Sequence, residues 1–259
     1  MASQPPANLP IMYNELQPLS SNVHGGYVAR SSDAAPFFAK VHAVPLTVDE
    51  FLHAQRSYPI VFSAGENPVP LALLGLNEGV NTFLKEDGTA DIPFYVPAYV
   101  RRYPYLLARM QPDAQELSLC FDPTSELIGE GGEGEPLFDG DKPSQRLNDI
   151  LKFCEDFEVA AQRTQGFMNE IKQLDLLIDG EVSIQPNDSE QPFVYRGFQM
   201  IAEDRFRDLH GDQLRKINQN GILPLVIAHL FSLTLIRDIF GRQMLQGKIP
   251  TQQPAPLGV

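Results

Sequence analysis

The sequence predicts an α+β fold, in which a β-rich N-terminal half packs against a helical C-terminal half that contains a β-hairpin. Two observations favour this class. Short apolar runs bounded by Pro and Gly fill the first 140 residues, whereas a helical period of apolar residues begins at Ser144. Because the strands come first and the helices later, the order indicates α+β and not repeated βαβ units.

The N-terminal half is predicted to contain short strands and one capped helix. Thr47 begins this helix, because Glu50 three residues later completes a capping box. Pro97 opens one further helical turn, which ends before Pro104. Strands are expected at residues 37–44, 58–63, 70–76, 92–96 and 117–121, with the second and third joined by a turn at 64–67.

The C-terminal half is predicted to begin with a long amphipathic helix. Its apolar stripe comprises Leu147, Ile150, Leu151, Cys154, Phe157, Ala161, Met168 and Ile171. A hairpin over 174–184 follows, with Asp179-Gly180 as its turn, and then a strand at 193–197. Helices are expected at 203–209, 211–219 and 223–243. The last is apolar on nearly every face, which favours a central position.

Length and composition fit one domain with short tails. Residues 10–249 are predicted to form a single domain, with a β-rich part at 10–140 and a helical part at 141–249. Residues 1–9 and 250–259 are polar and rich in proline, so we expect flexible tails there.

The net charge of −13 opposes binding to nucleic acid or to an anionic membrane, because the long-range field repels phosphate. The apolar run at 222–236 is too short for a span of about 20 residues, and it contains Pro224 and His229. The N-terminus has neither a basic start nor an apolar core typical of a signal peptide. We therefore expect a soluble, cytoplasmic protein without a membrane span.

Cysteine chemistry and standard catalytic signatures give no positive support for an enzyme. Cys120 and Cys154 form no CxxC pair, and we interpret them as buried free thiols. Neither sits in a nucleophile signature, and no G-x-S-x-G hydrolase motif is present. The sequence predicts no cofactor and no metal.

Residues 93–105, called here the aromatic-arginine segment, are the main candidate binding site. Tyr95, Tyr99 and Tyr103 are predicted to stack on a ligand while Arg101 and Arg102 hold its carboxylate or phosphate. In the alternative interpretation, which we favour from sequence alone, Phe94, Val96 and Val100 fill the core and the arginines pair with acidic residues.

Other candidate motifs have plainer explanations. Residues 129–134 match G-x-G-x-x-G, but their glutamates would repel a phosphate and Pro136 follows, so we expect a flexible acidic loop. The loop continues to residue 141, where calcium binding is an open alternative. Glu50 and His53 are expected to be a surface pair rather than half of a di-iron site. His229 is interpreted as a hydrogen-bonded core histidine, with ligand binding as the alternative.

Several ordered phrases resemble the bacterial SapC family, over residues 10–245. These phrases are His42–Leu46, Tyr58–Phe62, Leu71–Leu76, Asn81–Phe83, Tyr95–Pro104, Gly221–Leu223 and Ala228–Leu233. The family is associated with surface-layer loci and has no settled activity. Related genes occur near outer-membrane receptors and flavin-dependent halogenases, which implies a role in uptake or modification of peptides or sugars. A peptide-transporter permease of the same name is unrelated.

Two hypotheses follow. In the first, the protein is a noncatalytic accessory or binding protein that engages a small anionic ligand, a peptide or a partner protein. Its ligand-binding residues would be Tyr95, Tyr99, Arg101, Arg102, Tyr103 and His229. In the alternative, it is an enzyme or enzyme subunit acting on a peptide, amino acid or sugar. Attachment at the cell surface is implied only by the family name.

Overall fold

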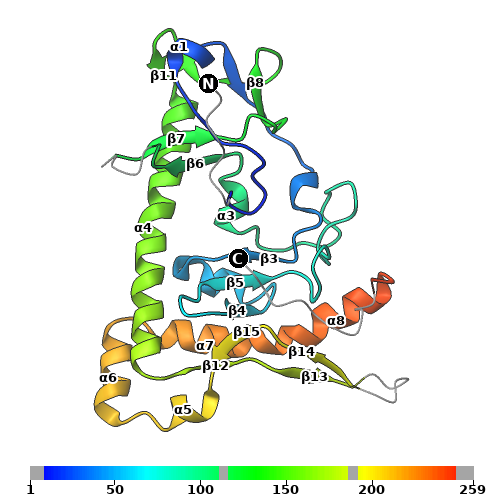
Figure 1. The fold of residues 1–259 in the computed structure, drawn as a ribbon, viewed down its shortest axis with the longest axis vertical. Coiled ribbons are helices and arrows are strands. Elements are labelled where there is room, and N and C mark those ends of the chain that lie inside the picture. Colours follow the sequence, from blue (N-terminus) through cyan, green and yellow to red (C-terminus); the bar gives the residue numbers. More distant parts are fainter. Residues whose placement is uncertain (1–8, 111–115, 186–191, 249–259) are drawn as a thin grey trace. The chain divides into compact units, whose positions relative to one another are not determined.

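The computed structural model describes residues 9–110, 116–185 and 192–248 (Figure 1). The predicted α+β class is confirmed, because several small sheets occupy the N-terminal half and the longer helices follow. The predicted tails lie outside the described residues, except for residue 9.

The chain divides into two compact units, each built from two separate segments. Unit 1 comprises Met1–Ala35 and Tyr99–Val159, and unit 2 comprises Pro36–Ala98 and Ala160–Val259. This division does not follow a boundary near residue 140, because both units contain strands and part of the long helix α4. The single domain over 10–249 stays a prediction.

Unit 1 contains two three-stranded antiparallel sheets, in the orders β1-β7-β6 and β8-β2-β9, and a small β10-β11 pair. The elements are β1 (Gln17–Pro18), α1 (Ser21–His24), β2 (Tyr27–Ala29), α3 (Ala98–Arg101), β6 (Tyr105–Ala108), β7 (Ser118–Phe121), β8 (Ile128–Glu130), β9 (Glu135–Pro136), β10 (Phe138–Asp139), β11 (Lys142–Pro143) and α4 (Gln145–Gln173) through Val159. The first residue of α3 belongs to unit 2.

The core of unit 1 forms where α4 packs on these strands. Leu147, Ile150 and Cys154 of α4 are buried with Tyr105 and Phe121, as the apolar stripe predicts. Burying each larger side chain contributes about 1.5–3 kcal/mol, which fixes the first turns of α4 against the sheets.

Unit 2 is built on a five-stranded antiparallel sheet in the order β12-β15-β4-β5-β3. Its elements are η1 (Pro36–Phe38), β3 (Ala43–Pro45), η2 (Val48–Glu50), α2 (Phe51–Ala54), β4 (Ile60–Ser63), β5 (Pro70–Leu73), β12 (Leu177–Asp179), β13 (Val182–Ile184), β14 (Phe193–Tyr195), β15 (Phe198–Ile201), α5 (Glu203–Arg207), α6 (Gly211–Gln219), α7 (Leu223–Ser232), η3 (Leu233–Leu235) and α8 (Ile236–Leu245), together with the rest of α4.

The predicted hairpin with Asp179-Gly180 as its turn is wrong in its pairing. β12 pairs with β15 and β13 pairs with β14, so Asp179 and Gly180 lie within one arm of a longer ribbon. Gly180 donates its N–H to the Phe198 carbonyl at 2.8 Å. A β-carbon at Gly180 would clash with the Phe198 ring, so glycine serves close packing here and not a turn. The connection between the arms lies partly outside the described residues.

Two predicted strands are also wrong. Phe37 and Phe38 belong to the turn η1, and only Ala43–Pro45 of that region pairs in a sheet. Residues 92–96 form no strand, because prolines at both ends limit ladder hydrogen bonds. Instead, the Tyr95 N–H donates to Ser57 Oγ at 3.0 Å.

The last predicted helix is interrupted and only partly buried. A 3₁₀ turn, η3, separates α7 from α8. Val226, Ala228 and His229 are buried, whereas Phe231 is 68% exposed. The helix therefore packs through one side, which corrects the expectation of a central position.

Candidate functional site

A pocket of about 300 Å³ lies within unit 1, and we call it the arginine pocket. Three parts of the chain line it. Residues 101–105 leave α3 and enter β6, residues 146–154 come from α4, and residues near β2 and β8 complete the wall. The lining is Ala29, Arg30, Arg101, Arg102, Tyr103, Pro104, Tyr105, Leu127, Arg146, Asp149, Ile150, Phe153 and Cys154.

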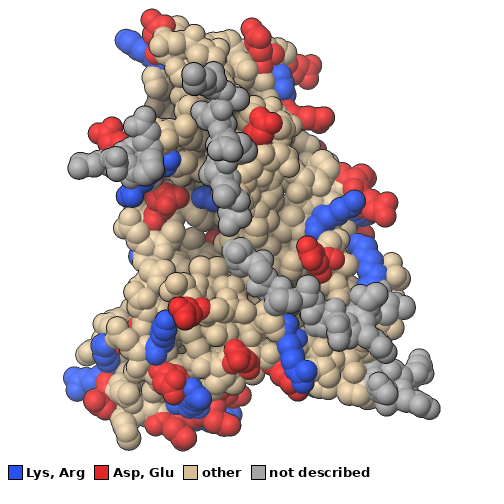
Figure 2. All heavy atoms as spheres, viewed as in Figure 1, with Lys and Arg blue, Asp and Glu red and all other residues tan. Residues whose placement is uncertain are grey.

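The arginine pocket concentrates positive charge in an acidic part of the chain. Unit 1 contains seven Lys and Arg residues and fifteen Asp and Glu residues. Four of those seven basic residues line the pocket, with Asp149 as its one acidic lining residue. On the face drawn in Figure 2, by contrast, blue side chains are scattered among red ones. The pocket is therefore a local cationic site in a chain that repels anions at long range.

Arg102 is held rigidly at one end of the pocket. Its guanidinium carbon lies 4.5 Å from the centre of the Tyr99 ring and 4.2 Å from that of Phe157. Arg102 is only 8% exposed, and its Nη1 lies 3.7 Å from Glu158 Oε1. The centres of these two rings are only 6.3 Å apart, so the rings hold the guanidinium from two adjacent sides and not from opposite faces. Its N–H groups remain the part that can bind an anion.

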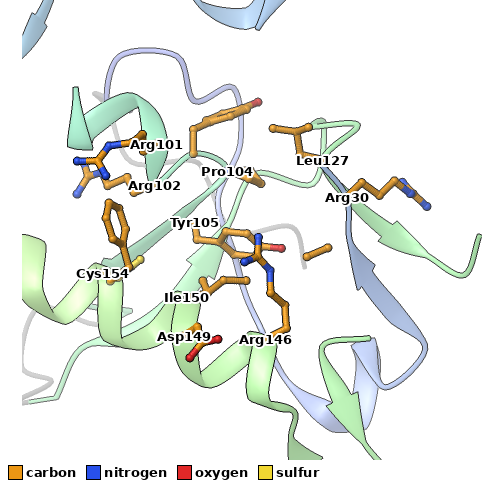
Figure 3. A pocket seen from close by; sticks show the side chains of 13 residues that line it. Arg30, Arg101, Arg102, Pro104, Tyr105, Leu127, Arg146, Asp149, Ile150 and Cys154 are labelled. Carbon is orange, nitrogen blue, oxygen red and sulfur yellow. The ribbon is translucent and has the colours of Figure 1, made fainter. Parts of the chain in front are cut away.

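Arg102 lies near Cys154, whereas Arg146 lies near Tyr105 (Figure 3). The Arg101 guanidinium carbon is 5.3 Å from the centre of the Phe153 ring. Arg30 has a different role. Its Nη2 donates to the Gly131 carbonyl at 2.9 Å, and its head points away from the pocket in Figure 3. Three guanidinium groups therefore remain near the cavity.

Three donors of the lining have no hydrogen-bond partner among the described residues: Tyr105 Oη, Arg102 Nε and Arg146 Nε. Tyr105 is 6% exposed, and burial raises the pKa of its hydroxyl to about 12, with the Arg146 charge acting in the opposite direction. A buried donor without a partner costs about 1–3 kcal/mol. The lining thus offers donors that no acceptor of the described residues meets at hydrogen-bond distance.

Tyr99 and Tyr103 support the wall of the pocket, and Tyr103 also lines it. Tyr99 Oη donates to the Ile11 carbonyl at 3.1 Å, and Tyr13 Oη donates to the Tyr105 carbonyl at 2.9 Å. The rings of Tyr13 and Tyr103 meet edge to face at 5.2 Å. Burial raises the pKa values of both Tyr99 and Tyr103, so their hydroxyls are neutral. The N-terminal segment therefore braces Tyr99, which holds Arg102, and also contacts Tyr103.

Both cysteines are buried free thiols, as the sequence predicts. Cys154 lines the pocket and is 2% exposed. Burial raises the pKa of its thiol to about 12, although Arg102 lowers it somewhat. The thiol is therefore protonated at neutral pH and is a weak nucleophile.

The predicted ligand-binding residues do not all line this pocket. Arg101, Arg102 and Tyr103 do, and Tyr99 holds Arg102, whereas Tyr95 and His229 belong to unit 2. Tyr95 Oη donates to Glu50 Oε1 at 3.1 Å. The binding roles of these six residues stay predictions.

Glu50 forms a buried structural junction in unit 2 and not the expected surface pair. It is 4% exposed, and its Oε2 accepts from the Thr47 N–H at 2.9 Å, which confirms the capping box. Oε1 accepts from the Ala98 N–H at 2.6 Å. His53 is exposed and stacks on Tyr95, with ring centres 5.6 Å apart.

His229 forms a second buried polar junction of unit 2, the His229 cluster, with Ile60, Ile201 and Ser232. Its Nδ1 lies 2.8 Å from the Ile60 carbonyl oxygen, and its Nε2 accepts from the Ile201 N–H at 3.0 Å. Burial lowers the pKa of His229 to about 4. Ser232 Oγ accepts from the Ile60 N–H at 2.9 Å. Both nitrogens of the neutral ring are thus used by the fold.

Most of the glycine-rich run forms a loop: residues 131–134 connect β8 to β9, whereas residues 129 and 130 lie in β8. The expected flexibility of this loop stays a prediction. Residues 128–130 and 135–136 form β8 and β9, and both strands pair with β2. In the described part of the chain, no three His, Cys, Asp or Glu side chains converge as metal ligands. Calcium binding by residues 129–141 therefore gains no support from the geometry.

Sequence reasoning missed Arg146 and Tyr105. Arg146 lies four residues before Ile150, on the buried face of α4, so a charge within the apolar stripe was the available signal. Tyr105 stood inside the aromatic-arginine segment. Its importance depends on its unpartnered hydroxyl, which no spacing reveals.

One helical stretch in the described residues, Leu223–Leu245, is long and apolar enough to cross a membrane by length and composition. Of its most apolar 18-residue window, 39% is buried. Core helices pass the same test, so this one stretch is weak support for a span. The cytoplasmic location stays a prediction.

These features define an α+β protein with a cationic, aromatic-walled pocket. The comparison with family models matches residues 19–239 to SapC, and the chain belongs to the SapC family. The comparisons with curated proteins and with solved structures each gave no match.

Proposed function

We propose that this protein is a noncatalytic accessory protein that binds a small anionic molecule in the arginine pocket. The convergence on one cavity of three guanidinium groups and of three donors without a hydrogen-bond partner among the described residues carries the proposal. Arginine suits this role, because its planar fork binds carboxylate or phosphate through two parallel hydrogen bonds.

The size of the cavity favours a small molecule over a peptide or a partner protein. About 300 Å³ is the low end of the range for small-molecule sites. Binding without turnover is favoured over catalysis by the protonated Cys154 thiol, because it is the one thiol in the lining and a weak nucleophile.

The proposal is tested by isothermal titration calorimetry at low salt, with sodium phosphate, pyrophosphate, succinate, suberate and benzoate as probes. We expect at least one probe to bind with a Kd of about 1 mM or lower. For any probe that binds, at least one of Arg101→Gln and Arg146→Gln should weaken the binding at least about tenfold, since each removes one guanidinium.

Arg109→Gln is the matched control. Arg109 is exposed in unit 1 and does not line the pocket, so this variant removes the same charge at another place. The proposal fails when no probe binds the wild-type protein, or when Arg109→Gln weakens binding as much as Arg101→Gln and Arg146→Gln do.

A further inference from the structure

The cationic groups of the arginine pocket lie at two ends of one helix face. Arg146, Ile150, Phe153 and Phe157 recur on α4 at the spacing of one face. Arg146 lies seven residues before Phe153, which is ~10 Å along the helix axis. Arg101 lies over Phe153, and Arg102 lies over Phe157. Arg146 therefore defines one end, and the Arg101–Arg102 pair defines the other.

The surface between the two ends is mostly apolar. Ile150 and Cys154 are buried and lie on this stretch of α4, and Leu127 and the Tyr105 ring line the same cavity. Asp149 is exposed, and its Oδ1 already accepts from Gln145 Nε2 at 2.8 Å. The middle of the pocket therefore suits hydrocarbon rather than a charged group.

Each end has its own loosely placed counter-charge. Glu158 Oε1 lies 3.7 Å from Arg102 Nη1, and Glu135 Oε1 lies 3.6 Å from Arg146 Nε. Both distances exceed that of a hydrogen bond. Each end also retains an unpartnered donor, with Tyr105 Oη adding a second donor near Arg146. An acid group of a ligand can therefore bind at either end, beside Arg102 or beside Arg146.

We infer that the arginine pocket takes a two-ended dianion: a small molecule with an apolar body and an acid group, carboxylate or phosphate, at each end. One acid group binds Arg101 and Arg102, and the other binds Arg146 and Tyr105. A hydroxyl without a hydrogen-bond partner among the described residues is not enough for this inference, because the Tyr195 hydroxyl of unit 2 also lacks one and lies outside the pocket. The inference rests on the proposed function and adds the ligand class.

The probes are α,ω-dicarboxylates from succinate to azelate, each compared by calorimetry with the monocarboxylate of equal carbon number and with inorganic phosphate. We expect an intermediate length, from adipate to suberate, to bind at least about tenfold more tightly than its monocarboxylate. Long-range repulsion by the acidic protein opposes a dianion, so this preference must arise inside the pocket.

Variants separate the two ends. Arg146→Gln should reduce dicarboxylate affinity to that of the monocarboxylate, and it should change monocarboxylate affinity less than about threefold. Arg101→Gln should likewise weaken dicarboxylate binding, because it removes a guanidinium at the opposite end of the pocket. Tyr105→Phe should weaken only the dicarboxylate, by about threefold to tenfold. Arg109→Gln should change neither.

The outcomes separate this inference from the proposed function. Equal affinity for mono- and dicarboxylates, no optimum of length, or binding of phosphate alone would overturn the two-ended ligand and leave an anion-binding pocket in place. Absence of binding by every anion tested would overturn both.

Discussion

The His229 cluster of unit 2 and the arginine pocket of unit 1 differ in whether their buried polar atoms have hydrogen-bond partners. In the cluster, both ring nitrogens of His229 meet backbone partners, and Ser232 completes the junction. In the pocket, Tyr105 Oη and Arg102 Nε are equally buried but have no partner among the described residues. A satisfied polar group stabilises the fold, whereas an unsatisfied one costs stability and favours a ligand.

The largest loss of stability is expected from replacing His229. Replacing His229 with Leu keeps the approximate volume but leaves the Ile60 carbonyl and the Ile201 N–H unpaired. The free energy of unfolding should fall by about 2–5 kcal/mol, measured by urea denaturation. His53→Leu, at an exposed histidine, should change it by less than about 0.5 kcal/mol. Equal losses of unfolding free energy in His229→Leu and His53→Leu would contradict a stabilising role specific to the His229 cluster.

A smaller loss of stability is expected when the pH is lowered. The pKa of His229 is about 4 in the fold and 6.5 in the unfolded chain, so the unfolded state binds more protons between these values. The stability that His229 contributes is therefore complete above pH 6.5 and is lost as pH falls toward 4. Between pH 7.5 and 5.0 we expect a loss of about 2 kcal/mol.

His229→Gln isolates this contribution, because an amide offers one donor and one acceptor without titrating. The pKa of His42 is also lowered by burial, so the wild-type protein has two histidines with the same sign of pH dependence. The difference between wild type and His229→Gln, measured by denaturation at both pH values, belongs to His229. Identical slopes for the two proteins would contradict the assignment.

The smallest change in stability is expected from replacing Tyr105, and it should contrast with the loss expected from replacing Tyr13. Tyr105→Phe removes a hydroxyl without a partner, so the free energy of unfolding should stay constant or rise by about 1 kcal/mol. Tyr13→Phe removes the hydroxyl that donates to the Tyr105 carbonyl and should lower it by about 1 kcal/mol. Denaturation of both variants checks this, and a loss at Tyr105 equal to that at Tyr13 would show that the Tyr105 hydroxyl already has a structural role.

Much of the fold was predictable because its signals are local. The capping box at Thr47 and Glu50, the apolar stripe of α4 and the paired strands β4 and β5 follow from neighbouring residues. The errors came where distant contacts decide. Gly180 looks like a turn residue until Phe198 is placed beside it.

The candidate site was predictable only in part, for the same reason. The aromatic-arginine segment pointed to Arg101, Arg102 and Tyr103, but 44 residues separate Arg102 from Arg146 in the chain. Only the fold brings them to one cavity. Tyr95 stood in the same segment, yet the division of the chain after Ala98 assigns it to the other unit.

Arg30 and Gly129 form a single steric pair at the wall of the arginine pocket. A β-carbon at Gly129 would lie 2.9 Å from Arg30 Nη1, so the absence of a side chain at one position accommodates the long side chain at the other. A side chain at position 129 would therefore displace the Arg30 guanidinium, which is the far end of a flexible side chain. The displacement would disturb the hydrogen bond from Arg30 Nη2 to the Gly131 carbonyl, and with it the link between β2 and the loop after β8.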